Sequence, residues 1–516
     1  MKDSISLGLG FATSAGTMSS IIESSHSRFS LKSPFQKLAI LGAISLISAL
    51  LSACGSDKNH SEYQGDVIVR VPWWLSDLDL GLGDPLVVNV SPQKGSQDKS
   101  LSSQPRFENI KLHGISNLQK VSGDFAQFLI YPQVNGQEIQ GLAPEAKFVR
   151  NEKGVFFPLN FLSAQMFSLY AHFERLLKLD EKLSVHPQLG TRTVLITSLE
   201  DSSSVVDNAF YKADIDSLIF IPYSQENVPL SVNPGVIAHE HFHAQFHRRF
   251  YLPLVQRKVL PPALMKASQT EAAKKEMGIN QDKDTDIAFQ KLSSREQDYF
   301  RVFIQGLNEG LADIWGWVYT GRSNFLALSL PQVGTSRDVK PRLQAQASTL
   351  PFKTKCSVFR DLVQIEASSK SSSQQNQFVL GSAYSLGTEF ARMFYLAAQV
   401  SREDRKASYV QSRVDLARRI YEFLPVLAYG IEKSLFKINP LDVFAIYAQE
   451  IKDLSEKECD FWKRLLNTSM NDTDAGFVCR SVLTSSNSAL DSAVFELRSV
   501  GGAKVFSARH REVPCR

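Results

Sequence analysis

Hydrophobic residues recur along the chain with two different periods. Between residues 66 and 157, short apolar runs at 67–71, 85–90, 128–134 and 154–159 alternate with turn-rich stretches such as 91–105. Short runs rich in Val, Ile, Phe and Tyr, bounded by turn residues, are typical of β-strands. We therefore predict a β-rich N-terminal region over residues 66–157.

A helical period begins near residue 163 and is followed by two strand-like runs at 193–199 and 217–222. The next helix begins after Asn233, because asparagine is a good N-cap and Pro234 suits the first helical position. Helical periodicity returns at 293–319 and dominates from residue 331, with a polar interruption at 368–377. The pattern predicts an α+β fold, with a mixed lobe over 158–330 and a mostly helical lobe over 331–516.

The segment before the β-rich region has a different character. An apolar run of about 14 residues, from Leu38 to Leu51, follows Lys32 and Lys37. The run is too short to span a bilayer comfortably, but it matches the core of a signal peptide.

This run ends in Leu51-Ser52-Ala53-Cys54, which resembles the lipobox of bacterial lipoproteins. The resemblance implies that residues 1–53 are a signal peptide, that Cys54 carries the lipid and that 54–65 form a tether. We expect a lipid-anchored protein of the cell envelope. Gly55 after the cysteine resembles the default for the outer membrane, with the protein facing the periplasm or the cell surface. The alternative is that Cys54 is an ordinary buried cysteine.

The remaining cysteines lie in the C-terminal third of the chain. An even number of cysteines in an oxidising compartment predicts two disulfides, with three possible connectivities. No CxxC-type spacing is present, so a zinc cluster made of cysteines is not expected. The four disulfide candidates are Cys356, Cys459, Cys479 and Cys515.

Composition narrows the possible classes of function. Of the 516 residues, 43% are hydrophobic and 21% are charged, which allows a sizeable core and excludes a wholly disordered chain. The formal net charge is +4, from 57 basic and 53 acidic residues. A nucleic-acid-binding protein carries a much denser basic surface, so we do not expect nucleic acid as a partner.

Candidate chemistry is concentrated in one stretch, because four of the ten histidines lie between residues 239 and 247. On a helix, His239 and His243 lie four residues apart, so both imidazoles can reach one metal ion. Glu240 can take a proton from a metal-activated water and is the candidate general base. We interpret His241 as structural, and His247 as either a supporting residue or an exposed one. The alternative for the whole stretch is a solvated helix face rich in histidine.

A second motif, Asn308-Glu309-Gly310-Leu311-Ala312-Asp313, lies on a later helix. Glu309 can provide a third metal ligand and leave the fourth position open, as catalytic zinc sites require. Asp313 lies one turn further along and can accept a hydrogen bond from the outer nitrogen of a ligating histidine. The alternative is that these are two solvated carboxylates.

Together the two motifs resemble those of the gluzincin clan of zinc metallopeptidases, thermolysin-like in the wide sense, over about residues 160–400. These enzymes carry H-E-x-x-H on one helix and N-E-x-x-[SA]-D on another. The resemblance implies one Zn²⁺ per chain, a zincin-like fold and a site in a cleft between the lobes. It makes His239, His243 and Glu309 the zinc ligands, Glu240 the base and Asp313 a residue that supports a ligand.

Two further segments extend the resemblance. Asn208 and Ala209, followed by two aromatic residues, are similar to the edge-strand segment that pairs with an extended substrate in such peptidases. Asn208 as a simple turn residue is the alternative. Tyr384, in Tyr-x-x-Gly387, is similar to an element that begins a helix in related gluzincins, and it is the candidate donor to the oxyanion. The alternative is a tyrosine of the helix core.

One departure leaves the subfamily open. The two motifs lie 66 positions apart, from His243 to Glu309, which is longer than the gap of the thermolysin type. We expect residues 266–286 to form an inserted helical excursion. Membrane peptidases that process prenylated proteins combine similar motifs, but no apolar run after Cys54 is long enough here for a membrane-spanning helix.

The sequence therefore predicts a zinc metallopeptidase that hydrolyses polypeptides in the cell envelope. One alternative is a lipoprotein that keeps a peptidase fold but acts as a scaffold or chaperone for extended chains. Another is a regulated precursor, in which residues 66 to about 155 cover the site.

Overall fold

The computed structural model describes most of the chain from Gly65 onward. For some residues inside helices and strands it describes the backbone only. The described residues are 65–73, 106–135, 138–185, 189–196, 208–221, 228–262, 264, 287–341, 355–368, 372–434, 438–469, 498–500 and 503–505. Several predictions lie outside them, namely those for the signal peptide, Cys54, the strand-like run 85–90, the excursion at 266–286, Cys479 and Cys515.

Two mixed five-stranded sheets form the N-terminal half. Sheet A has the order β3-β2-β1-β7-β6, and sheet B has the order β5-β4-β8-β10-β9. The strands of sheet A are β1 (Gly65–Trp73), β2 (Arg106–Asn117), β3 (Ser122–Gly123), β6 (Phe148–Arg150) and β7 (Val155–Pro158). Those of sheet B are β4 (Ala126–Asn135), β5 (Glu138–Leu142), β8 (Arg192–Ile196), β9 (Ala209–Lys212) and β10 (Ser217–Phe220). Parallel pairs lie at the centre of sheet B, where β8 joins β4 and β10.

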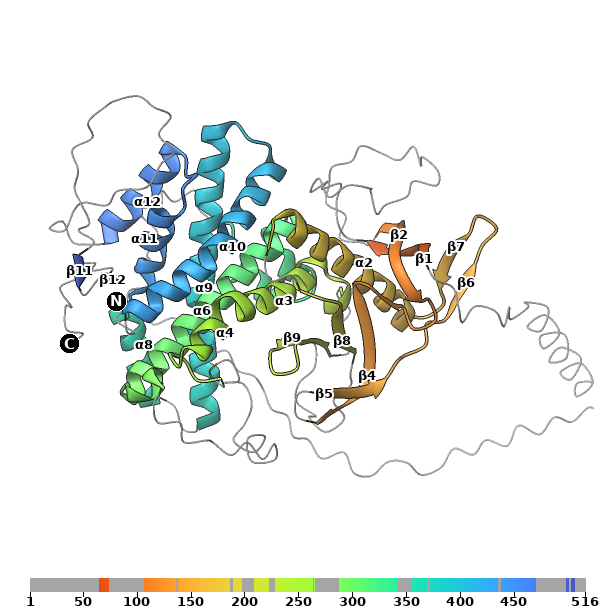
Figure 1. Cartoon of the computed structure of the whole chain (residues 1–516), viewed down its shortest axis with the longest axis horizontal. Coiled ribbons are helices and arrows are strands. Elements are labelled where there is room, and N and C mark those ends of the chain that lie inside the picture. Colours follow the sequence, from red (N-terminus) through yellow and green to blue (C-terminus); the bar gives the residue numbers. More distant parts are fainter. Residues whose placement is uncertain are drawn as a thin grey trace, which may run out of the picture. The chain divides into compact units, whose positions relative to one another are not determined.

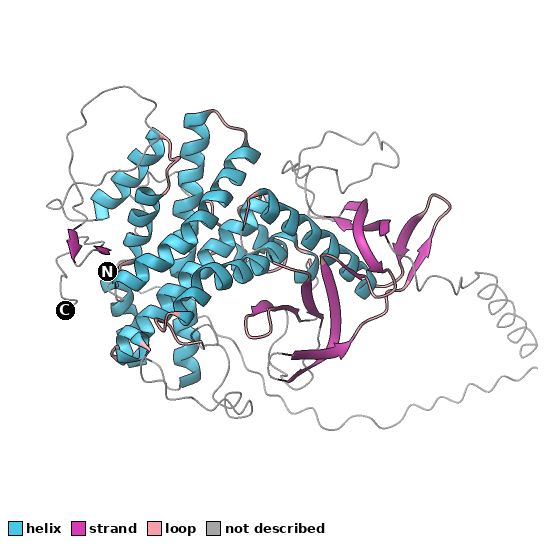
Figure 2. Cartoon of the chain, in the orientation of Figure 1, coloured by secondary structure: helices cyan, strands magenta, loops and turns pink. Residues whose placement is uncertain are grey.

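Helices dominate the rest of the described chain (Figure 2). They are α2 (Phe161–Lys182), α3 (Pro234–Phe246), α4 (Leu252–Gln256), α6 (Ser294–Thr320), α7 (Pro331–Gly334), α8 (Lys355–Ser368), α9 (Ser372–Arg405), α10 (Tyr409–Ser434), α11 (Pro440–Glu450) and α12 (Glu456–Ser469). Shorter elements are the 3-10 turns η2 (Leu230–Val232), η5 (Ala288–Lys291) and η6 (Phe325–Leu328), and the π-helix η3 (His247–Tyr251). A hairpin of β11 (Arg498–Val500) and β12 (Ala503–Val505) follows.

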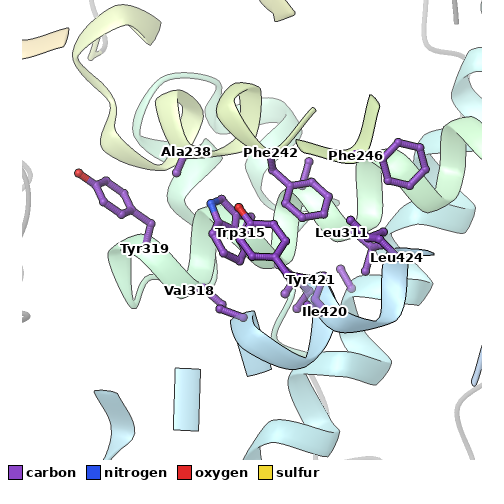
Figure 3. Packing of buried hydrophobic residues seen from close by; sticks show 14 of the residues in the cluster. Ala238, Phe242, Phe246, Leu311, Trp315, Val318, Tyr319, Ile420, Tyr421 and Leu424 are labelled. Carbon is purple, nitrogen blue, oxygen red and sulfur yellow. The ribbon is translucent and has the colours of Figure 1, made fainter. Parts of the chain in front are cut away.

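One hydrophobic core extends from β1 to α12. Helix α3 packs along α6, and α6 packs along α9 (Figure 1). The apolar stripe of α3 meets aromatic side chains of α6 and α10 (Figure 3). There the ring of Phe242 lies 5.5 Å from that of Trp315 and 6.1 Å from that of Tyr421, between ring centres. This packing fixes one face of α3 and leaves another face for polar residues.

Most predicted elements are confirmed, including the α+β class and the helix after Asn233. Two differ. The twelve-residue strand β2 is not predicted by the sequence pattern, and α9 begins inside the polar stretch 368–377, at Ser372. Sheet B also crosses the boundary expected at residue 157, because β4 and β5 belong to the same sheet as β8. The β-rich region therefore contributes directly to the sheet that lies beside α3.

No helix among the described residues is long and apolar enough to cross a membrane. The predicted disulfides stay a prediction. Cys459 is buried on α12, whereas the description of Cys356 on α8 extends to its backbone only.

Candidate metal centre

Polar contacts and close packing fix the start of α3. Asn233 caps the helix by accepting hydrogen bonds from the backbone N–H groups of Gly235 (3.0 Å) and Val236 (3.4 Å). Its amide also donates to the carbonyl of Phe325 and to the hydroxyl of Ser329. A Cβ atom at Gly235 would come within 2.3 Å of the Phe325 ring, so only glycine allows this approach. The helix that carries the histidines thus begins at a fixed place against η6.

Three side chains from two helices converge at one point. The Nε2 atoms of His239 and His243, both on α3, lie 3.0 Å apart. The carboxylate of Glu309, on α6, places Oε2 at 3.4 Å from Nε2 of His239 and Oε1 at 3.8 Å from Nε2 of His243. The structure therefore brings together the three predicted ligands, although 66 positions separate the two motifs.

The outer ring nitrogens of the two histidines also lie close to polar side chains of α6. Nδ1 of His239 lies 3.0 Å from an oxygen of Asp313, and Nδ1 of His243 lies 2.9 Å from the side-chain oxygen of Asn308. A proton on each Nδ1 leaves the lone pair of each Nε2 directed towards Glu309. The sequence predicts the partner role of Asp313. It gives no role to Asn308, although Asn308 directly precedes the predicted ligand Glu309.

The spacing of these atoms suits a divalent cation. In tetrahedral coordination with bonds of about 2.0–2.1 Å, neighbouring ligand atoms lie about 3.3 Å apart. The Nε2 atoms lie 3.0 Å apart, and each lies 3.4 or 3.8 Å from its nearer Glu309 oxygen, distances around this value. Ligand atoms of His239, Glu240 and His243 also lie within 4.8 Å of one another. The residues present therefore fit a bound metal ion.

Glu240 is buried beside the convergence point. Its Oε2 lies 4.0 Å from Nε2 of His243 and has no hydrogen-bond partner among the described residues. Burial raises the pKa of the Glu240 carboxyl to about 8, against the opposing effect of the His239 charge and of the backbone amide of Tyr211. A carboxyl group with this pKa can both accept and donate a proton near neutral pH.

Neighbouring charges split the pKa values of the two histidines. Burial alone would lower the pKa of His239, but the Asp313 and Glu309 carboxylates raise it to about 10. Burial and the charge on His239 lower the pKa of His243 to about 4. The pair therefore favours a single positive charge, with an additional proton on His239 and a neutral His243. A divalent cation would compete with that proton for the same lone pairs.

Arg337, which the sequence does not single out, joins the two carboxylates of α6. Its Nη2 atom donates to Glu309 at 3.0 Å and to Asp313 at 2.7 Å, and its Nε donates to Asp313 at 3.0 Å. Burial opposes its charge, but Asp313 and Glu309 hold the pKa of Arg337 above its usual range. Arg337 therefore fixes the side-chain positions of both carboxylates.

Tyr384 lies next to this group on α9. The guanidinium of Arg337 stacks over its ring, 4.5 Å from the ring centre. The charge on Glu309, together with burial, raises the pKa of Tyr384 well above its usual range. The phenol therefore keeps its proton and remains a hydrogen-bond donor close to the predicted ligands.

Glycines on both helices allow Tyr384 to come this close. A Cβ atom at Gly310 of α6 would lie 2.3 Å from the carbonyl oxygen of Gly387 on α9, and one at Gly387 would lie 2.7 Å from that of Gly306. The two backbones are therefore in direct contact beside Glu309. Any larger residue at these positions would separate α6 from α9.

The predicted edge-strand segment lies beside α3. β9 is the last strand of sheet B and pairs antiparallel with β10, so Ala209 stands opposite Phe220. Asn208 precedes the strand, accepts a hydrogen bond from the N–H of Ile221 through its carbonyl and is exposed. Among the described strands, β9 has no neighbour on its outer edge, and an edge of this kind can pair with another extended chain.

The two other histidines of the cluster lie away from the convergence point. His241 is buried and places Nε2 at 2.8 Å from Asp180 of α2, which agrees with a structural role. His247, the first residue of η3, stacks on Tyr251 and lies near Tyr211.

No model of a known protein family matches the chain, and comparison with the curated proteins also gives no match. Functional conclusions therefore rest on the side-chain geometry described above.

Proposed function

We propose that this protein is a zinc-dependent metallopeptidase with a zincin-like fold of the gluzincin kind. The observation that carries the proposal is the convergence of His239, His243 and Glu309 from two helices. Two imidazole nitrogens and one carboxylate, with one position left open, are the donor set of catalytic zinc sites. Glu240 is buried beside the same point, and its Oε2, which has no hydrogen-bond partner in the described part of the chain, lies 4.0 Å from Nε2 of His243.

A zinc ion bound here would polarise the scissile carbonyl group and make a neighbouring water more acidic. Glu240 accepts a proton from that water and later passes it to the departing amine. Tyr384, which keeps its phenolic proton, donates a hydrogen bond to the oxyanion that develops on the carbonyl oxygen. Asp313 and Asn308 hold the two imidazoles in the orientation described above.

The substrate in this proposal is an extended polypeptide. Asn208 and Ala209 lead into β9, whose outer edge can add a peptide strand through backbone hydrogen bonds. Because β9 lies beside α3, a peptide paired with it would run past Glu240.

The proposed location is the cell envelope, with a lipid on Cys54. The support is the sequence motif alone, which lies outside the described residues. Loss of the lipid from a Cys54→Ser variant, measured by mass spectrometry of the mature protein, tests this part independently of the chemistry.

Glu240→Gln tests the catalytic proposal directly. The amide keeps the size of the side chain but cannot accept the proton, so we expect peptide hydrolysis to fall by about 10²–10⁴-fold while zinc content stays unchanged. His239→Ala should lose zinc as well. If Glu240→Gln keeps full cellular function, the hydrolase proposal is wrong and the scaffold alternative is favoured.

A further inference from the structure

Three side chains from three elements meet at Asp216, the last residue of the turn between β9 and β10. The hydroxyl of Tyr211 on β9 donates to its Oδ1 at 2.8 Å, and Arg192 on β8 lies 3.3 Å from the same oxygen. Arg248, in the π-helix η3, donates to Oδ2. We call these four residues the Asp216 hub.

The backbone at Asp216 adopts a left-handed conformation, which aspartate tolerates better than most residues. Its φ angle is +44°, in the left-handed region that residues other than glycine, asparagine and aspartate rarely adopt. Burial opposes ionisation of this carboxyl, but Arg192, Tyr211 and Arg248 keep its pKa below the usual range. The contacts of the hub therefore hold the ionised carboxylate, and with it this turn, in one place.

The hub connects the edge strand to the helix that carries the metal ligands. η3 continues directly from α3, so Arg248 is fixed to the end of the helix that begins at Asn233. Nearer the start of α3, the backbone amide of Tyr211 on β9 faces the Glu240 carboxylate. Tyr211 thus contacts the hub through its hydroxyl group and the candidate base through its backbone.

We infer that Tyr211 and Asp216 form a latch that sets the position of β9 against α3, and thereby positions an extended peptide relative to Glu240. This inference rests on the proposed peptidase function. Both are positioning residues, because neither needs to touch the reacting atoms. The latch should affect long substrates most, since only these pair with β9 over several residues.

Tyr211→Phe is the test variant. It removes one hydroxyl group and leaves both arginine–Asp216 pairs in place, whereas a change at Asp216 would leave the buried Arg192 without its carboxylate partner. We expect KM for a long peptide to rise about tenfold, with kcat and KM for a short peptide of the same scissile bond nearly unchanged. Zinc content should not change.

Tyr170→Phe is the matched control. Its hydroxyl is also part-buried and donates to the backbone of β2 in sheet A, away from β9. A general loss of stability would affect both variants equally and would not depend on peptide length. The latch is rejected if Tyr211→Phe changes KM for long and short peptides by the same factor, or if the control behaves like it.

Hydrogen exchange of the β9 amides separates the latch from the proposed chemistry. We expect exchange at residues 209–212 to be about tenfold faster in Tyr211→Phe than in the wild type, with sheet A unchanged. Unchanged exchange in β9 would overturn the latch even in an active peptidase. An inactive wild type with faster exchange in the variant would reject the peptidase proposal and leave the latch standing.

Discussion

At the scale of single residues, Arg337 links Glu309 and Asp313, the two carboxylates of the proposed metal centre. It makes three hydrogen bonds to Glu309 and Asp313, and these need the planar, forked guanidinium group. The ammonium group of a lysine cannot donate to both carboxylates in the same geometry. Arg337 therefore belongs with the proposed metal centre, although it cannot be a ligand.

Arg337→Lys should accordingly weaken zinc binding by about 10–100-fold, because residues that orient metal ligands typically contribute this much. A competition titration with a zinc chelator measures the change. Arg418→Lys is the control, since Arg418 pairs with Asp453 and Glu422 at the surface, away from the site. Equal affinities of the two variants would show that Arg337 does not hold Glu309 in place.

Much of this site is predictable from the sequence, and the reason is helical periodicity. Spacings of four residues place His239 next to His243 and put Glu309 and Asp313 on one face, so local sequence carries three-dimensional information. Arg337 has no such signal. Its position depends on how the chain turns after α7, which no local pattern encodes.

At the scale of elements, the contact between α6 and α9 determines where Tyr384 lies. Gly306, Gly310 and Gly387 let the two backbones touch beside Glu309. Spacing in the sequence shows two glycines four residues apart on α6, but it does not identify the helix that packs there. That partner is set by packing of the whole core.

Gly310→Ala should push the helices apart, because its Cβ would come within 2.3 Å of the Gly387 carbonyl oxygen. We expect the free energy of unfolding to fall by about 1–3 kcal/mol, with a loss of hydrolysis as Tyr384 moves away. Urea unfolding and peptide cleavage measure the two effects. Gly381→Ala is the control: no atom lies within 4 Å of its added Cβ, so it should not destabilise the protein.

The strands show where sequence patterns fail. β1, β8 and β10 are continuous apolar or alternating runs and are predicted. β2 is not, because its pairing with β1 is irregular between the buried residues Leu112 and Ile115, at Gly114, whose φ is +62°. A pattern of period two is broken at such an irregularity, although the strand continues past it.

At the scale of the whole molecule, His172 joins sheet A to the helices. Its ring stacks on Trp73 of β1 with centres 4.4 Å apart, and its Nδ1 lies 2.9 Å from the hydroxyl of Tyr319 on α6. Burial lowers the pKa of His172 to about 3. The folded protein therefore keeps this imidazole neutral, whereas the unfolded chain protonates it below about pH 6.5.

Stability should therefore fall as the pH decreases from about 6.5 towards 3, because the unfolded state binds the extra proton. His172 contributes a slope of at most about 1.4 kcal/mol per pH unit. Urea unfolding at several pH values between 7 and 5 measures it. His172→Phe keeps a ring beside Trp73 and should show a smaller slope; identical slopes would contradict this role for His172.

In sheet A, the two ends of the connection between β1 and β2 lie side by side. Trp73 and Arg106 stand opposite each other at the end of the β1–β2 pair, so the chain leaves the sheet and re-enters it at the same point. Insertions or deletions between these two residues during evolution would leave the β1–β2 register unchanged. For the same reason, a reporter domain grafted between Trp73 and Arg106 would leave the β1–β2 register and the connection from sheet A to the helices in place.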